Sequence, residues 1–312
     1  MQGGPWAHIA EEISDELGVD FRPDSVKPIG GGCINEAVQL SDGTTSFFVK
    51  TNTKALKGMF DAEALGMKAL AAANAIRVPE VYLTGVAGSC SWIAMEYLEF
   101  GTSSRAGYSA LGAQLAEQHR VTHDHFGFEC DNTIGSTPQP NSYHESWVSF
   151  LRDQRLGFQF ALAAQAGCAF EGADRLLAAL PEFFANYTPE PSLLHGDLWS
   201  GNVAFSCENQ PIVFDPAVYY GDREAEFGII AMFGGFDQSF FEAYEEAYPF
   251  QSGSESRQDL YLLYHQLNHF NLFGSSYRES VRGTMGAYWV RLIEEESSEL
   301  PANGPVKGFF SL

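Results

Sequence analysis

Basic residues are scarce in this sequence. It holds 18 lysines and arginines against 40 aspartates and glutamates, which gives a formal net charge of -22 at pH 7. A protein that binds nucleic acid or anionic lipid through its charge needs basic patches on its surface. The balance therefore argues against nucleic-acid and membrane-surface partners, and the acidity favours solubility.

Paired cysteines and long apolar runs are also missing. The five cysteines form no C-x-x-C pair, which argues against a zinc finger or a disulfide framework and fits a reducing cytoplasm. Residues 1–18 carry four acidic side chains where a signal peptide needs a basic start and an apolar run. No stretch is long and apolar enough to span a bilayer. We therefore predict a cytoplasmic protein.

The first hundred residues contain most of the strand signals, in a chain whose 45% apolar content can fill a large core. Strand-like runs occupy residues 25–40 and 45–50. Asp42 and Gly43 lie between them and predict a hairpin, because this dipeptide accepts the positive φ angles of a tight turn. The sequence therefore begins with a β-rich region.

A helix with Phe60, Met67 and Leu70 on one face is predicted next, and residues 91–98 read as another strand. From residue 106 onward most of the sequence is predicted to be helical, except for a Pro- and Asn-containing segment at residues 132–141 and a strand-like pair around residues 193–215. No internal repeat or long linker occurs. These features predict an α+β fold of two lobes, a β-rich N-terminal lobe and a mainly helical C-terminal lobe. The predicted lobes are residues 1–100 and 101–312.

The octapeptide His195-Gly196-Asp197-Leu198-Trp199-Ser200-Gly201-Asn202 is the strongest functional signal. Asp197 and Asn202 have the spacing of a kinase catalytic loop, in which the Asp accepts the proton of the attacking hydroxyl and the Asn holds magnesium. Asp215 follows the apolar run 212–214, where a second carboxylate could bind the magnesium that bridges nucleotide phosphates. The pattern predicts Asp197 as the base, and Asn202 and Asp215 as metal ligands.

Lys50 and Glu63 supply a candidate phosphate anchor. Lys50 ends a predicted strand, and Glu63 shares its helix face with Phe60, Met67 and Leu70. A carboxylate that faces the interior needs a partner, and the Lys50 ammonium is the natural one. We therefore predict an ion pair that orients the nucleotide.

Two backbone segments complete the predicted nucleotide site. The run Gly30-Gly31-Gly32-Cys33 lets amide groups approach phosphate oxygens, although it matches neither a Walker A loop nor the protein-kinase glycine loop. The strand end Met95-Glu96-Tyr97-Leu98 lies where the lobes join, so its backbone could bond to an adenine edge. A thiol on the glycine loop could also be acidified, and we hypothesise that oxidation of Cys33 blocks ATP binding.

With these residues in place, the chain resembles the fructosamine (ketosamine) kinases, relatives of aminoglycoside and choline kinases with a protein-kinase-like fold. The resemblance covers nearly the whole length. Besides the octapeptide, it rests on these runs: residues 30–37, Phe126-Gly127-Phe128 with Asp131-Asn132, residues 134–141, Phe214-Asp215-Pro216-Ala217 and residues 220–226.

The resemblance implies that ATP and Mg²⁺ are used to phosphorylate O3 of a ketosamine, free or as a glycated protein, which leads to release of the amine. Trp199 is expected to stack on the sugar, and Asp222 and Glu224 to recognise hydroxyls or the protonated amine. Two alternatives stay open: a related kinase for another alcohol (aminoglycoside, choline or homoserine), and an inactive kinase-like binding protein. A monomer and a homodimer are both compatible with the sequence.

Overall fold

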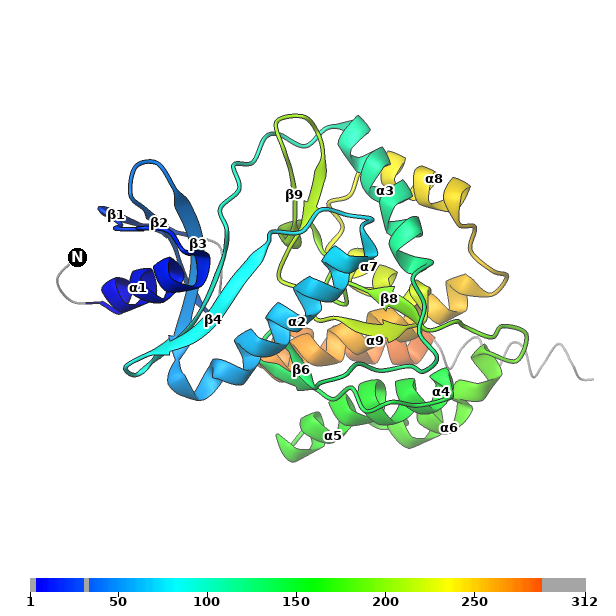
Figure 1. The fold of residues 1–312 in the computed structure, drawn as a ribbon. Helices are drawn as coiled ribbons and strands as arrows, with labels where there is room; N and C mark the ends of the chain where they lie inside the picture. Colours follow the sequence, from blue (N-terminus) through cyan, green and yellow to red (C-terminus); the bar gives the residue numbers. More distant parts are fainter. Residues whose placement is uncertain (1–3, 31–33, 288–312) are drawn as a thin grey trace, which may run out of the picture.

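The N-terminal lobe is built on a five-stranded antiparallel sheet. The structure, a computed structural model, describes residues 4–30 and 34–287. The strand order is β1-β2-β3-β5-β4, and the sheet lies at the left of Figure 1. Its strands are β1 (Ser25–Ile29), β2 (Glu36–Ser41), β3 (Ser46–Thr53), β4 (Val81–Ala87) and β5 (Cys90–Glu96).

The predicted hairpin at Asp42-Gly43 is present between β2 and β3. Gly43 has a φ of +86°, and the carboxylate of Asp42 accepts hydrogen bonds from the backbone amides of Thr44 and Thr45. The turn chemistry thus fixes the register in which Ser41 pairs with Ser46.

Strand β4 was not expected from the sequence. Gly85 interrupts its apolar run and weakens the strand signal. In the sheet Gly85 lies opposite Trp92 of β5, and a Cβ at Gly85 would lie 2.4 Å from the indole ring. The glycine is therefore required by a tertiary contact that the local sequence does not reveal.

Two helices cover opposite faces of this sheet. Ile9 and Ile13 of α1 (Trp6–Leu17) pack in one buried cluster with Val49 of β3. Phe60 of α2 (Lys57–Ala73), which follows η1 (Lys54–Leu56), belongs to the other cluster, together with Ile93 of β5. Because neighbouring strand residues point to opposite faces, Lys50 lies on the α2 side when Val49 packs toward α1.

The C-terminal lobe is mainly helical, and it fills the right of Figure 1. At its centre α7 and α9 pack closely, since a Cβ at Gly228 of α7 would lie 2.5 Å from the backbone of Tyr261 of α9. Its helical segments include α3 (Arg105–His119), α4 (Trp147–Phe150), η2 (Leu151–Leu156), α5 (Gly157–Gln165), α6 (Ala173–Phe183), η3 (Ser200–Asn202), η4 (Arg223–Ala225), α7 (Glu226–Phe233), α8 (Gln238–Ala247), α9 (Ser254–Phe273) and η5 (Gly274–Tyr277).

Three short antiparallel strand pairs connect these helices with the cleft. They are β6 (Asn132–Ile134) with β7 (Thr137–Gln139), β8 (Ser192–Leu194) with β11 (Tyr219–Gly221), and β9 (Val203–Phe205) with β10 (Pro211–Val213). A β-bridge between Arg77 and Ile212 ties the two lobes together. The two-lobed α+β fold is confirmed, while the boundary between residues 100 and 101 stays a prediction. Among the described residues, no helix combines the length and hydropathy needed to cross a bilayer.

Candidate active site

A cleft of about 520 Å³ lies between the lobes. The N-terminal lobe contributes Lys50 from β3 and Glu63 from α2, and the C-terminal lobe contributes Asp197, Asn202 and Asp215. Residues that are 165 positions apart in the chain, Lys50 and Asp215, are in direct contact here. The cleft therefore gathers the charged and amide side chains that the sequence assigned to phosphoryl transfer.

The predicted catalytic loop runs from β8 through η3 (Ser200–Asn202) to β9. Gly196 has a φ of +82°, and a Cβ at this position would lie 2.1 Å from the carbonyl oxygen of Ala217. Only glycine fits such an approach. The segment at 196 is thereby held against the segment that follows Asp215, which explains the glycine of the His-Gly-Asp motif.

His195 is buried and links the two halves of the site. Its Nε2 lies 3.0 Å from the carbonyl oxygen of Phe214, which can only accept, so Nε2 carries the proton and Nδ1 can accept the amide of Asp197. Burial lowers the pKa of His195 below its usual value. The neutral imidazole therefore connects the loop at Asp197 with the segment before Asp215 through these two hydrogen bonds.

Asn202 orients Asp197. Its Nδ2 donates to the backbone oxygen of Asp197 over 2.9 Å and lies 3.2 Å from the Oδ2 of Asp197. Burial, followed by the charge of Asp215, raises the pKa of Asp197 well above its usual value. A carboxylate in this environment binds a proton more strongly than one in water, which suits a general base.

Lys50 forms the ion pair expected with Glu63, with 2.6 Å between Nζ and Oε1, and it also contacts Asp215. Burial opposes its charge, but the two carboxylates outweigh this effect and raise the pKa of Lys50. Its side chain is 6% exposed, whereas that of Asp215 is 45% exposed. The Lys50 ammonium is thus buried and held in its charged form, whereas the Asp215 carboxylate remains exposed to the cleft.

The donor set next to Asp197 suits a hard divalent cation. The Nδ2 of Asn202 donates to Asp197 and lies 3.3 Å from the backbone oxygen of Asp215, so its Oδ1 is the atom left for a metal. Asp215 adds a carboxylate on a left-handed backbone with φ of +57°. Amide and carboxylate oxygens are the ligands that Mg²⁺ prefers.

Glu226 is a site residue that the sequence did not single out. Its buried carboxylate accepts the backbone amides of His195 over 2.7 Å and of Gly196 over 2.9 Å. His119 Nε2 lies 3.6 Å away, while its Nδ1 contacts the hydroxyl of Tyr244. Burial opposes ionisation of Glu226, but these partners lower its pKa. The sequence feature that could have identified Glu226 is its place in the family-specific run 220–226, four residues after Asp222.

The other predicted contacts divide into three groups. Trp199 lines the cleft, where its indole covers Gly201. Gly30 directly follows β1, and a Cβ added there would meet no atom within 4 Å. Gly31, Gly32 and Cys33 lie outside the described residues, as does the hypothesis on Cys33 oxidation. No described contact tests an adenine role for Met95, Glu96, Tyr97 and Leu98, and their role stays a prediction; Glu96 pairs with Arg77.

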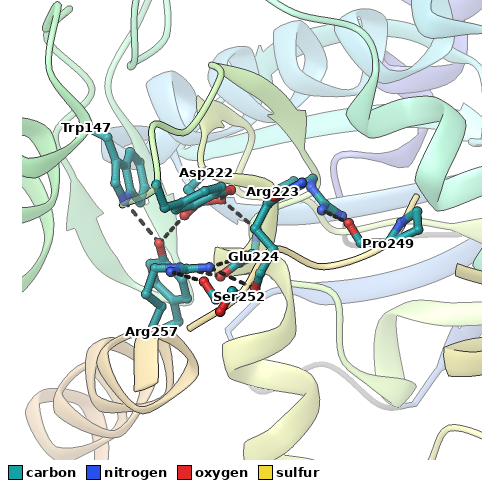
Figure 2. Close-up of polar contacts among 10 residues, drawn as sticks. Trp147, Asp222, Arg223, Glu224, Pro249, Ser252 and Arg257 are labelled. Atoms are coloured by element: carbon teal, nitrogen blue, oxygen red, sulfur yellow. Dashed lines mark hydrogen bonds and ion pairs between the residues drawn. The ribbon is translucent and has the colours of Figure 1, made fainter. Parts of the chain in front are cut away.

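Asp222 and Glu224 do not reach the cleft, and their assignment to the substrate is corrected here. Both are 0% exposed. Asp222 accepts the hydroxyls of Tyr187 and Tyr261, and Glu224 holds Arg257 through two hydrogen bonds of 2.8 and 2.9 Å. Figure 2 shows Asp222 and Glu224 among these polar partners, with Glu224 bonded to Arg257. They anchor α9 to the segment that precedes α7, because a buried carboxylate is stable only when it is paired.

The hairpin β6–β7 belongs to the other family-specific run. Asn132 donates to the backbone oxygen of Val218, and Gln139 donates to that of Ala217. Its turn lines the cleft at Gly135, where an added Cβ would lie 3.0 Å from Leu272 of α9. The hairpin therefore supports the segment that carries Asp215 and closes one wall of the cleft.

Comparisons with known proteins agree with this geometry. Residues 5–290 match the family described as Fructosamine kinase. A probable ketoamine kinase of Synechocystis sp. is 40% identical over 279 residues, covering 89% of this chain and 95% of that protein. A chloroplastic protein-ribulosamine 3-kinase of Arabidopsis thaliana is 46% identical over 266 residues, covering 83% and 81%.

Solved structures of similar fold include a relative of the same family. A Haemophilus somnus protein assigned as a fructosamine-3-kinase superposes with a TM-score of 0.85 at 28% identity, covering 91% of this chain and 97% of that one. A mutant of the aminoglycoside phosphotransferase APH(4)-Ia, solved with AMP-PNP and hygromycin B, superposes with a TM-score of 0.60 at 17% identity, covering 90% and 97%, which shows the fold alone. The chain belongs to the fructosamine kinase family.

Proposed function

We propose that this protein transfers the γ-phosphoryl group of ATP to a hydroxyl, O3, of a ketosamine. The observation that carries the proposal is the convergence of Lys50, Asp197, Asn202 and Asp215 in one cleft between the lobes. A catalytically inactive binding protein would not need this set. Family membership, together with the names of the relatives, supports a ketosamine as the acceptor.

Asp197 is the catalytic base of the proposed reaction. Its carboxylate accepts the proton of the acceptor hydroxyl while that oxygen forms a bond to the γ-phosphorus. The bond from this phosphorus to the bridging oxygen breaks, and ADP leaves. Asn202 keeps the carboxylate in place through the contact between its Nδ2 and the Oδ2 of Asp197.

The remaining charged residues serve the nucleotide. We assign Lys50 to the α- and β-phosphates, with Glu63 holding the ammonium in position. The amides of the run from Gly30 to Cys33 and the backbone of residues 95–98 are the proposed contacts to phosphate and adenine. Asn202 and Asp215 are the proposed ligands of Mg²⁺, which when bound neutralises the charge that develops on the phosphates.

The product explains the expected biological outcome. A phosphate on O3 is a leaving group next to the C2 carbonyl, so the phosphorylated ketosamine can decompose and release its amine. The acceptor class therefore includes free ketosamines and glycated proteins, and the reaction leads to deglycation. This step needs no further side chain of the protein.

The test is ATP turnover with a panel of acceptors. Ribulosamines and fructosamines are compared with an aminoglycoside, choline and homoserine, and NMR locates the phosphate on the product. We expect turnover with ketosamines, and a loss of about a thousandfold in kcat for Asp197→Asn. Asp20→Asn, which changes a carboxylate that is 77% exposed, is the matched control. Turnover with another alcohol and with no ketosamine would refute the proposed acceptor.

A further inference from the structure

Five rings line the C-terminal wall of the cleft and form a continuous row, here called the aromatic ladder: Trp199, Phe233, His269, Phe273 and Tyr277. Trp199 and Phe233 have centroids 5.3 Å apart, and Phe233 and His269 have centroids 5.1 Å apart. His269 continues to Phe273 at 5.6 Å and to Tyr277 at 5.3 Å. The row begins at Trp199, two positions after Asp197, and includes Phe233 and Phe273, the last residues of α7 and α9.

The ladder is more exposed than packing alone explains. Phe233 is 40% exposed and Phe273 is 57% exposed, although neighbouring aromatic residues of α7 and α9, such as Phe227 and Phe270, are buried. Covering exposed apolar surface in a cleft is favourable, because it removes apolar area from water. A ligand in the cleft can supply that cover.

Charge divides the cleft into two ends. Four charged side chains line the cleft in the described part of the chain: Lys50, Glu63, Asp197 and Asp215. They lie together at the phosphoryl-transfer end, where Lys50 contacts both Glu63 and Asp215. The one basic side chain of the ladder is His269, whose Nδ1 donates to the carbonyl oxygen of His265 over 2.9 Å. Burial lowers the pKa of His269, which disfavours its charged form. Within residues 4–30 and 34–287, the aromatic end thus presents no lysine or arginine to a carboxylate.

We propose that the aromatic ladder is the subsite for the amine substituent of the ketosamine, and that it selects flat apolar substituents over carboxylate-bearing ones. The inference rests on the proposed function. In an in-line transfer the acceptor oxygen attacks opposite the leaving ADP. A ketosamine whose hydroxyl lies at Asp197 therefore extends, with its amine substituent, to the side away from the nucleotide. The ladder starts at Trp199, beside Asp197, so it lies where that substituent can stack.

The experiment compares ketosamines with one sugar and three amines: benzylamine, butylamine and glycine. For the wild-type protein we expect KM to be about tenfold lower with the benzylamine derivative than with the glycine derivative. Phe233→Ala and Phe273→Ala should each raise KM for the benzylamine derivative about fivefold, and should leave kcat and the glycine derivative nearly unchanged. Both residues end helices and are exposed, so folding should tolerate their loss.

Tyr143→Ala is the matched control, because Tyr143 is 47% exposed and stacked on His123 but does not line the cleft. The inference is overturned if the ladder variants change KM equally for all three amines, or if the wild-type protein does not distinguish them. If the wild-type protein phosphorylates no ketosamine, the proposed function is wrong and the inference falls with it. If all three are turned over without selection, only the inference falls.

Discussion

The carboxylate of Glu226 accepts a hydrogen bond from the backbone amide of His195, with 2.7 Å between His195 N and Glu226 Oε2. The other carboxylate oxygen accepts the amide of Gly196. The first turn of α7 thereby holds the main chain just before Asp197, and the position of the proposed base depends on a residue that does not line the cleft.

Glu226→Gln should separate positioning from binding. A carboxamide has only one acceptor oxygen, so at least one of the hydrogen bonds from the backbone amides of His195 and Gly196 is lost. The NH₂ group of the glutamine then faces a backbone N–H, and two donors oppose each other. We expect kcat to fall by about 10- to 100-fold, KM for ATP to change little, and the free energy of unfolding to fall by about 2–3 kcal/mol. Steady-state kinetics below the melting temperature and urea unfolding measure these effects.

Glu182→Gln is a suitable control for this change, since Glu182 is exposed on α6. A variant at position 226 that folds and keeps the wild-type kcat would mean that the catalytic loop holds its conformation without the carboxylate.

The ion pair of Lys50 and Glu63 predicts strong coupling in a double-mutant cycle. Lys50→Met should lower kcat/KM for ATP by about a hundredfold or more, and Glu63→Gln by about tenfold, because the glutamate acts through the lysine. The double variant should be little worse than Lys50→Met alone. Lys57→Met is the control, as Lys57 pairs with Asp61 on the same helix outside the cleft. Additive effects would show that the two residues act separately.

Asn202→Ala should change the magnesium requirement. Removal of Oδ1 takes away one proposed metal ligand, so the Mg²⁺ concentration for half-maximal rate should rise by about tenfold or more, and kcat should fall as well. Rates measured over a Mg²⁺ titration at saturating nucleotide test this expectation, with Asn186→Ala on the exposed surface as control. A lower kcat with an unchanged Mg²⁺ requirement would show that Asn202 is not a metal ligand and acts only by positioning Asp197.

Asp222 predicts a pH dependence of stability rather than of substrate binding. Burial and then the charge of Glu224 raise the pKa of Asp222 from 3.8 to about 6. A carboxyl group with a raised folded-state pKa stabilises the fold fully below pH 3.8, and this contribution is lost as the pH rises through 6. Relative to Asp222→Asn, the wild-type protein should therefore lose about 2 kcal/mol of unfolding free energy between pH 4.5 and 7.5.

Urea unfolding of both proteins at the two pH values measures this difference, and KM for the ketosamine should be the same in both. A large rise in KM for Asp222→Asn, with no change in the pH dependence of stability, would show that Asp222 contributes to substrate binding after all.

Local chemistry made much of the fold predictable. The turn at Asp42-Gly43 follows from two residues, and the burial of Phe60, Met67 and Leu70 follows from helical spacing. Strand β4 was missed because Gly85, which weakens the local signal, is required by the ring of Trp92 in the neighbouring strand. Such a requirement is a property of the sheet and not of the segment.

Local patterns were enough to predict the residues of the proposed chemistry: an aspartate and an asparagine at catalytic-loop spacing, a second aspartate at a strand end, and a lysine next to Val49 in a strand. Tertiary structure alone decided which carboxylates face the cleft and which are buried anchors. Asp215 remains 45% exposed, whereas Asp222, Glu224 and Glu226 are almost wholly buried. The physical reason is that a carboxylate has the same sequence signature in either place, and only its packed neighbours supply the partners that make burial stable.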